Sequence, residues 1–515
     1  MAARREVFSH REVFLSLAML SVTSVSVYTA LWFVDFGPGG PSPWALFTNP
    51  QTVSTLANLG EVTVGTLGVA LTVITIIVEL ASNRYTPRIT ELFIRDPVNV
   101  LMMSFFVVTA LLVLWVDMSM YSDHWPKWMA IAAISGMSTS LLLLLPYFAY
   151  VFDFLLPTRV VNRIQQTSAN AIERVTRRGA SAIDGARDEV IQAIEQLGEI
   201  ALNSVDSKDK GITIASLNAL SDLGEANQIY KAALPASWFD PTVLVETDQD
   251  FIAMHPDVVR ALEARRTWVE MKILRQFQHV FEESLIKMRD ICHFIAIQTR
   301  KLAINAAHAG DSEAVALYVR FLNTYMRAAL NTRDQKSAYN LMNEYRLLGE
   351  ALVSMKRTDE VLLIAERLKF YGQLAFKMKL PFILETVAYD MCTLLERAAG
   401  EPCEDRLLGV FLDVDRAAED DQAQEASLRG VRKAQVKLAT WYLAQGRALL
   451  AKRIHDDMRN EPIVRLEAIH RELKSVVDSE FWEVSDRGVN FEYLPPERRA
   501  KLDEFFASFY REDPA

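Results

Sequence analysis

The chain has 515 residues, half of them hydrophobic, and a formal net charge of −10. This length exceeds that of a single domain, and the apolar fraction predicts a membrane part joined to a soluble part. The acidic balance argues against nucleic acid as a general partner.

Four uncharged stretches in the first third of the chain predict membrane spans. The spans lie at about residues 13–34, 59–82, 98–116 and 128–152, within a transmembrane domain of residues 1–157. Arginines gather before the first span, between the second and third, and after the fourth. Because basic residues near span ends stay on the cytoplasmic side, we expect a multi-pass plasma-membrane protein with both termini in the cytoplasm. The first stretch is too long for a signal-peptide core and is interpreted as a retained span.

The second span carries a line of small and polar residues on one helical face. They recur at steps of three and four, and include Glu61, Gly65, Gly68, Thr72, Thr75 and Glu79. The two glutamates are separated by about 27 Å of helix, so each belongs near one face of the bilayer. Two interpretations are open. Either the small residues allow close helix packing while the glutamates reach headgroups, waters or arginines, or several copies bring the line to an axis as a cation pore with an acidic ring at each mouth.

Basic residues next to the spans predict contact with anionic lipid headgroups. Arg84 and Arg88 follow the second span, and Arg159 and Arg163 follow the fourth. The bilayer is therefore one expected partner of the chain.

Motifs around the second and third spans resemble a known family. They are Leu80-Ala81-Ser82-Asn83-Arg84-Tyr85-Thr86-Pro87-Arg88, Phe93-Ile94-Arg95-Asp96-Pro97, Phe152-Asp153-Phe154 and Val161-Asn162-Arg163-Ile164. Over about residues 56–174 the chain is similar to predicted bacterial membrane proteins known as domain of unknown function 2254. That family usually has Gln where this chain has Glu79, so the resemblance implies no role for this carboxylate. It implies a polytopic membrane protein and no established activity.

A long helix is predicted after the fourth span, because no proline occurs between Pro157 and Pro235 and the apolar residues repeat every eleven positions. The rows are Val161, Ile172, Ile183 and Ile194, then Ile164, Val175, Ala186 and Leu197, then Ser168, Gly179, Val190 and Ala201. About 40 residues would form a stalk of roughly 60 Å. We expect the rows to be the seam of a homo-oligomer; alternatively, the helix lies on its own domain.

The rest of the chain predicts one amphipathic helix after another. We expect the stalk and a first hairpin in residues 158–233, an irregular connector in 234–256 and a cytoplasmic helical domain in 257–515. Asp209, Asp311 and Asp359 recur where they could cap helices, which supports a repeat. The fold class is therefore all-α: a four-helix transmembrane bundle, a long stalk helix and an α-solenoid-like cytoplasmic domain. The segment Asp486–Arg499 is expected to dock back on this domain, or alternatively to bind a partner.

The soluble part contains no phosphate-binding loop, zinc-ligand pair or nucleophile elbow. We therefore expect no enzyme activity, cofactor or metal site. Cys292, Cys392 and Cys403 are expected to be free thiols in the reducing cytoplasm. The sequence favours a membrane protein with an interaction or regulatory domain for a cytoplasmic protein partner. The alternative is a homo-oligomeric cation channel lined by the second span.

Overall fold

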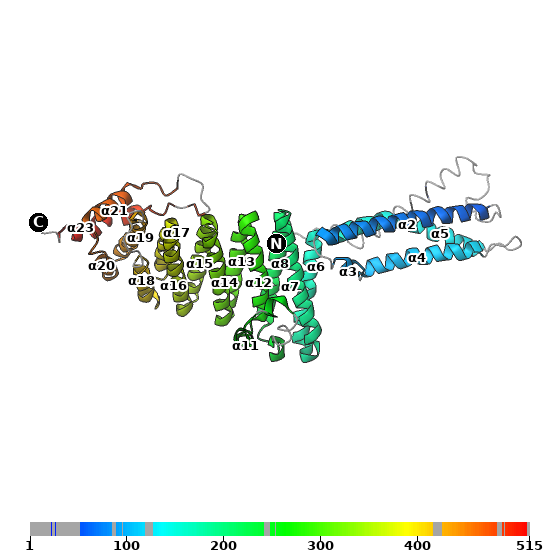
Figure 1. Cartoon of the computed structure of the whole chain (residues 1–515), viewed down its shortest axis with the longest axis horizontal. Coiled ribbons are helices and arrows are strands. Elements are labelled where there is room, and N and C mark those ends of the chain that lie inside the picture. Colours follow the sequence, from blue (N-terminus) through cyan, green and yellow to red (C-terminus); the bar gives the residue numbers. More distant parts are fainter. Residues whose placement is uncertain are drawn as a thin grey trace. The chain divides into compact units, whose positions relative to one another are not determined.

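The computed structural model describes residues 22, 26, 52–84, 89–94, 96–118, 127–240, 248–252, 254–415, 425–481, 487–488 and 490–511. All regular elements in these ranges are helices, as predicted. The chain forms two compact units, Met1–Ile164 and Gln165–Ala515. Figure 1 labels their helices.

The N-terminal unit contains the apolar helices. Its elements are α2 (Thr52–Arg84), α3 (Ile89–Ile94), α4 (Pro97–Met118), α5 (Lys127–Phe154) and the first turns of α6 (Pro157–Arg178). Among the described residues, three helical stretches are long and apolar enough to cross a membrane: Gly60–Ser82, Pro97–Met118 and Trp128–Phe154. These match the second, third and fourth predicted spans. The first predicted span, residues 13–34, lies outside the described residues apart from Val22 and Ser26.

Small residues bring α2, α4 and α5 close together. A Cβ atom added at Gly60 of α2 would meet Val113 of α4 at 2.7 Å, and one added at Gly136 of α5 would meet Thr109 of α4 at 3.2 Å. Close backbone approach through small residues is the usual way membrane helices pack, because lipid supplies no hydrophobic driving force. The buried core of this contact is formed by Val113, Val116, Ala133 and Met137.

The predicted single stalk helix is wrong. Helix α6 begins at Pro157 as expected, but it ends at Arg178. Gly179 has φ +65°, a 3₁₀ turn (η2, Gly179–Ala182) follows, and α7 (Ile183–Asp206) then begins. Because only glycine adopts this backbone conformation without steric cost, Gly179 ends the helix. Arg174 and Glu189, on opposite sides of the turn, pair at 2.5 Å, so α7 folds back along α6.

The eleven-residue rows are buried within the chain itself. Ile172 and Val175 of α6 and Val190 and Ile194 of α7 have no exposed surface. Helix α7 packs against α8 (Lys210–Tyr230) and α12 (Trp268–Lys287). The rows therefore correctly mark a buried face, and the described part of the chain covers it without a second copy.

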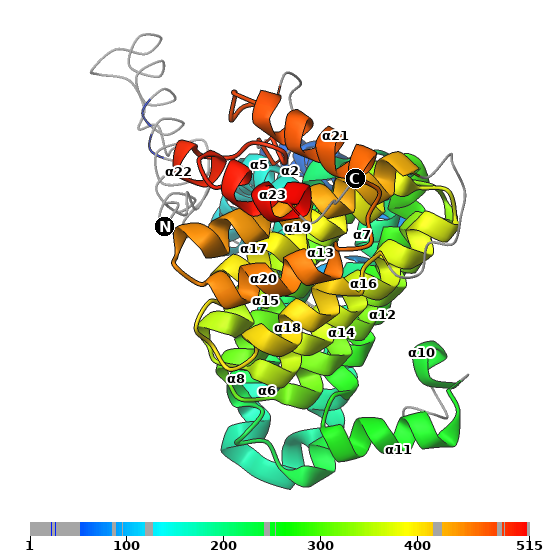
Figure 2. The same cartoon turned by 90° about the vertical axis from the view of Figure 1, so that its left-hand side faces the viewer.

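Most of the C-terminal unit is a stack of antiparallel helices in two layers. The further helices of the stack are α13 (Arg289–His308), α14 (Ser312–Asn331), α15 (Gln335–Ser354), α16 (Thr358–Lys377), α17 (Pro381–Arg397), α18 (Glu404–Leu412) and α19 (Glu425–Ala444). Layer A consists of α7, α12, α14, α16 and α18, and layer B of α8, α13, α15, α17 and α19; neighbours within each layer are in contact. Figure 2 looks along this stack.

The stack has a constant spacing. Helices α13 to α18 begin at residues 289, 312, 335, 358, 381 and 404, which are 23 residues apart. The turn before α14 shows how α13 to α16 end: the Asp311 amide donates to Ala306 O at 2.9 Å, and the Gly310 amide to Ala307 O at 3.1 Å. This is a Schellman motif, which requires a left-handed residue. The left-handed residues of successive turns are Gly310, Arg333, Lys356 and Lys379.

Two of the three predicted helix caps are confirmed. Asp209 and Asp311 accept hydrogen bonds from the amides three residues later and cap α8 and α14. Asp359 is not a cap, because α16 begins one residue earlier, at Thr358. Its carboxylate lies in the first turn, where the helix dipole favours a negative charge without a capping bond.

The connector after α8 contains short helices. They are η3 (Ala236–Phe239), α10 (Gln249–Ile252) and α11 (Pro256–Arg265). Residues 241–247 of the predicted irregular connector lie outside the described residues. Trp238 and Phe239 are buried, and the Trp268 indole N–H donates to Trp238 O at 2.8 Å. These aromatic contacts hold η3 against α12.

The C-terminal segment, defined here as Arg487 to Leu494 with residue 489 outside the described ones, docks on layer B as predicted. Arg487 pairs with Asp390 of α17 at 2.6 Å. Phe491 stacks on Tyr389 at 5.0 Å, and its carbonyl accepts a bond from Lys437 of α19 at 2.8 Å. The chain then ends in α22 (Pro496–Arg499) and α23 (Leu502–Arg511), with α20 (Ala448–Asp457) and α21 (Ile463–Ser475) completing this end.

Candidate functional site

The polar line of α2 lies outside the buried contact of this helix with α4 and α5, and two of its members, Thr75 and Glu79, border a cavity. Its members are Glu61, Gly65, Gly68, Thr72, Thr75 and Glu79, and all of them are exposed. The buried face of α2, which includes Leu67, Ala70, Ile74 and Val78, lies toward the other helices. A Cβ atom added at Gly65 or Gly68 would meet no atom within 4 Å. None of the described helices therefore makes the close approach that these two glycines would allow.

Three threonine hydroxyl groups on α2 already have hydrogen-bond acceptors. Thr66, Thr72 and Thr75 donate to the carbonyls four residues earlier, at 2.8–2.9 Å. Such bonds satisfy a hydroxyl inside a helix. The threonines can therefore face lipid or another helix without an unpaired donor, and their oxygen lone pairs remain available as acceptors.

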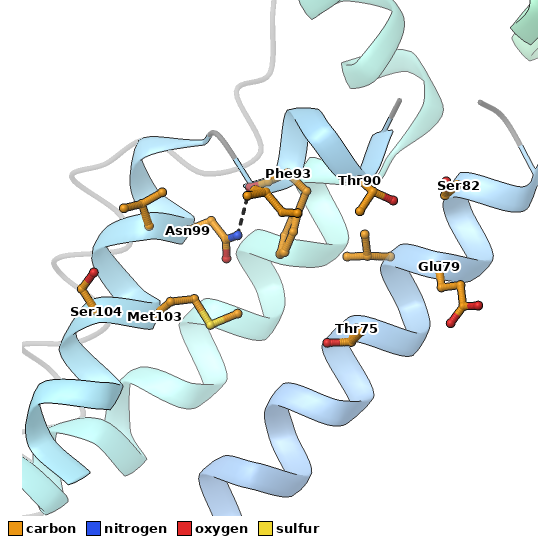
Figure 3. Close-up of a pocket in the computed structure, with 11 residues that line it drawn as sticks. Thr75, Glu79, Ser82, Thr90, Phe93, Asn99, Met103 and Ser104 are labelled. Carbon is orange, nitrogen blue, oxygen red and sulfur yellow. Dashed lines mark hydrogen bonds between the residues drawn. The ribbon is translucent and has the colours of Figure 1, made fainter. Parts of the chain in front are cut away.

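A cavity of about 570 Å³ lies beside one end of this line (Figure 3). It is bounded by α2, α3 and α4 and lined by Thr75, Val78, Glu79, Ser82, Thr90, Phe93, Ile94, Asn99, Val100, Met103 and Ser104. In Figure 3, Ser82 and Thr90 lie on facing elements at one end, while Met103 and Ser104 lie further along α4. Glu79 stands at the rim, with its carboxylate on the side of α2 away from α3 and α4.

Asp96 holds together the elements that form one wall of the cavity. Its Oδ1 accepts bonds from the amides of Val98 and Asn99 at 3.1 and 3.3 Å, which caps α4. The same oxygen accepts a bond from the Tyr150 hydroxyl of α5 at 2.5 Å, and Oδ2 lies 3.4 Å from Arg163 of α6. One carboxylate thus joins the start of α4 to α5 and α6.

Asn99 fixes the short helix α3 in the same way. Its amide donates to Phe93 O at 2.9 Å, and its side-chain oxygen accepts a bond from the Tyr147 hydroxyl. Phe93 packs edge-on against Phe154 of α5 at 5.5 Å. This part of the cavity wall therefore combines a hydrogen-bonded amide with aromatic rings in contact.

These features belong to a part of the chain that matches a known family model. Residues 10–213 match the family model described as "Predicted membrane protein (DUF2254)". The resemblance predicted from the motifs at residues 56–174 is thereby confirmed, and the match extends through α6, α7 and the start of α8.

Other comparisons add little about the DUF2254 region or the helical stack. No curated protein matches the chain. One matching solved structure is a "Circular tandem repeat protein with novel repeat topology and enhanced subunit contact surfaces". It is 15% identical and covers 90% of this chain and 95% of that chain, with a TM-score of 0.25. This similarity is too distant to inform the fold.

The predicted lipid-binding arginines of the DUF2254 region that are described have partners within the chain. Arg159 lies 3.7 Å from Asp153, and Arg163 pairs with Asp96 and covers the Phe154 ring at 4.1 Å. Both keep more than a third of their side chains exposed. The Arg84 side chain and all of Arg88 lie outside the described residues.

Sequence reasoning did not assign a role to Asp96, Asn99, Tyr147 or Tyr150. A local pattern could have identified Asp96, because an aspartate directly before a proline at the start of an apolar run is typical of a helix N-cap with proline at the first helical position. The tyrosines are 48 and 54 residues further along the chain from their partners, so only the fold brings them together.

The C-terminal unit contains three buried thiols. Cys292, Cys392 and Cys403 are free and buried, and burial raises the pKa of the Cys292 thiol to about 12. Such a thiol is a poor nucleophile. Within the described ranges, no three His, Cys, Asp or Glu side chains are placed to hold a metal ion.

Proposed function

We propose that this protein is a membrane-anchored scaffold whose helical stack binds a protein partner on the cytoplasmic side of the plasma membrane. The stack has the construction of an α-solenoid, in which helix pairs contact their neighbours and create extended faces. Such faces commonly bind other chains, and the proposal requires no catalytic group.

The docked C-terminal segment carries this proposal. Arg487 covers the Tyr339 ring of α15 at 4.0 Å and pairs with Asp390 of α17, and Phe491 contacts α17 and α19. Besides Arg487 and Phe491, Glu492 pairs with Lys433 at 2.6 Å. The face of layer B therefore binds an irregular segment with both polar and aromatic contacts.

The same face continues onto α13 and α8, whereas the described contacts of the C-terminal segment with layer B are made with α15, α17 and α19. Tyr389 is the ninth residue of α17, and the ninth residues of α13 and α8 are Ile297 and Asn218. Lys301 lies one helical turn after Ile297, on the same side of α13. Lys301 and Asn218 are exposed. We assign the partner-binding surface to this open part of layer B.

Charge reversal on the open face tests the scaffold. Lys301→Glu combined with Asp222→Lys changes two exposed residues of layer B, and Arg320→Glu, on α14 of layer A, is the matched control. A biotin ligase fused to the full chain would label neighbouring proteins in cells. We expect the layer B variant to lose a specific set of labelled proteins that the control retains. Identical labelling by both variants and the unmodified chain would refute the assignment.

A second candidate function, a cation channel, is favoured by the orientation of α2. Its polar line is exposed outside the α4 and α5 contact, so several copies could bring Glu61 and Glu79 to a common axis. Neutralising either glutamate should then lower cation selectivity without dissociating the assembly.

Planar bilayers containing the purified protein test the channel. Glu61→Gln, Glu79→Gln and Gly68→Leu would be compared with the unmodified chain. Absence of current from the unmodified protein under voltage, tension and a range of cations, with its assembly state confirmed by mass, would remove this candidate and leave the scaffold.

A further inference from the structure

We propose that the cavity between α2, α3 and α4 holds one acyl chain of a membrane lipid whose ammonium head group pairs with Glu79. The cavity volume of about 570 Å³ is within the range typical of small-ligand sites. Its walls belong to two apolar helices and the short helix α3 between them, so a membrane surrounds it and a lipid is the available occupant.

The apolar part of the cavity lining suits a hydrocarbon chain. Val78, Phe93, Val100 and Met103 supply apolar surface. Two polar residues in this wall already use their hydrogen-bonding groups: the Thr75 hydroxyl donates to Leu71 O at 2.9 Å, and Asn99 is bonded at both side-chain polar atoms. A methylene chain beside them therefore leaves neither group without its bond.

The acyl chain alone cannot select one lipid. Lipid tails are as apolar as the cavity wall, so moving a tail from bilayer to cavity yields little hydrophobic free energy. The preference must come from the head group. Glu79 is the charged residue of the lining, and Ser82 and Thr90 place hydroxyl groups at one end.

The position of Glu79 fits a head group outside the cavity. Its carboxylate is exposed and lies at the rim rather than inside, near the end of the Gly60–Ser82 apolar stretch. Carboxylates at that depth reach the headgroup layer. A primary ammonium group offers both a positive charge and hydrogen-bond donors to this carboxylate, and an anionic head group would be repelled.

Lipid retention by the full chain tests the site. The protein would be reconstituted in vesicles with equal amounts of dioleoyl phosphatidylethanolamine and dioleoyl phosphatidylglycerol, extracted in mild detergent and analysed by native mass spectrometry. We expect one retained lipid per chain and a preference of about fivefold for phosphatidylethanolamine, the factor that a partly exposed ion pair provides.

Matched variants separate tail from head group. Met103→Trp and Val100→Phe fill the cavity and should abolish retention; Leu111→Trp, on the same helix but not in the lining, should not. Glu79→Gln should remove the head-group preference while retention persists, whereas Glu61→Gln should preserve both.

Three results would overturn the proposal: no retained lipid on the unmodified chain, equal retention by the filled and control variants with unchanged melting temperatures, or an unchanged preference in Glu79→Gln. The measurement involves neither current nor protein partners. Its outcome is therefore independent of both candidate functions.

Discussion

Replacing Arg487 by methionine should release the C-terminal segment from layer B. The Arg487 side chain is 6% exposed, its Nη1 lies 2.6 Å from Asp390 Oδ1, and its guanidinium lies 4.0 Å from the centre of the Tyr339 ring. Methionine retains an apolar stem of similar length and removes the charge. The substitution therefore tests the polar contact and not the shape of the segment.

The size of the effect follows from these contacts. A hydrogen bond to a charged group contributes roughly 1.5–3 kcal/mol, and a desolvated cation–π contact about 2 kcal/mol. Asp390 would stay buried with one cation fewer, but Arg346 Nε still lies 3.2 Å from its Oδ1, which limits the loss. We expect docking to weaken by about 3 kcal/mol, which is roughly a hundredfold.

Hydrogen exchange of the detergent-solubilised full chain measures this release. The Asn490 amide donates to Ser479 O, beyond the end of α21, at 3.1 Å, and the Tyr493 amide closes a turn on Asn490 O at 3.2 Å. We expect both bonds to open when the segment leaves layer B. Exchange of the two amides should accelerate about a hundredfold in Arg487→Met. Arg498→Met is the control: Arg498 pairs with Glu396 at 2.7 Å but lies in α22, outside the segment, so the exchange of these two amides should change less than roughly tenfold.

A second substitution tests the electrostatic reason. Burial raises the pKa of Asp390, and Arg487 and Arg346 oppose that rise. Removing Arg487 should raise this pKa further and leave a costly buried charge, so Asp390→Asn in the Arg487→Met background should slow exchange again. If Arg487→Met exchanges no faster than Arg498→Met, or if Asp390→Asn brings no recovery, the buried ion pair does not hold the segment.

Three further predictions concern packing, pH and topology. Gly372→Ala should destabilise the stack by roughly 1 kcal/mol, because the new Cβ would meet three atoms of the stiff Val387 side chain at 3.2 Å; Gly185→Ala, with no atom within 4 Å, should stabilise α7 by about 0.5–1 kcal/mol. In denaturant unfolding, the two substitutions should change the free energy of unfolding in opposite directions, and changes in the same direction would contradict the packing argument. Burial raises the pKa of Asp415 to about 6, so between about pH 4 and 6 the folded chain binds a proton that the unfolded chain does not, and stability falls as pH rises through this window. Asp415→Asn should abolish this pH dependence and leave the free energy of unfolding at pH 7 unchanged or higher, since Arg432 still has Asp457 at 2.7 Å and Glu461 at 2.8 Å. Urea unfolding at pH 4.5 and 7 measures the difference. The same pH dependence in the variant would exclude Asp415 as its source. Cysteines placed at Ser42 and Ser122 should react with an impermeant reagent on intact cells, and one at Ser508 should not, because both termini are predicted to be cytoplasmic; labelling at Ser508 would refute that orientation.

Periodicity predicted which faces are buried but not what buries them. The eleven-residue rows through Ile172 and Ile194 do mark a buried face, yet the chain reverses at Gly179 between them. Because α6 and α7 bury the same rows after folding back, the pattern fits a straight helix and a hairpin equally well. A local feature, a glycine after two arginines, carried the distinction.

The 23-residue spacing was not recognised because its key position is chemically variable. In the turns before α14 to α17 the left-handed residue is glycine only at Gly310 and is Arg333, Lys356 and Lys379 in the next three. The motif depends on backbone geometry, and a long basic side chain in solvent accepts that geometry at a cost of about 1 kcal/mol. A search for recurring residue types therefore finds the aspartate caps but not the left-handed positions of the turns, where the residue type changes.

Only the two ends of the polar line of α2 carry groups that are costly to place in hydrocarbon. Its threonine hydroxyls are satisfied by their own backbone, so the middle of the line can face hydrocarbon without a partner. The free-energy cost of burial in hydrocarbon is concentrated at the carboxylates of Glu61 and Glu79, which are about 27 Å apart and reach opposite headgroup layers. An outward-facing line of this kind therefore does not require a pore. It requires a polar environment at each end, which water, a lipid ammonium group at Glu79 or an assembled acidic ring would each supply. The Glu79→Gln and Glu61→Gln variants distinguish among these three environments because each variant alters one end of the helix.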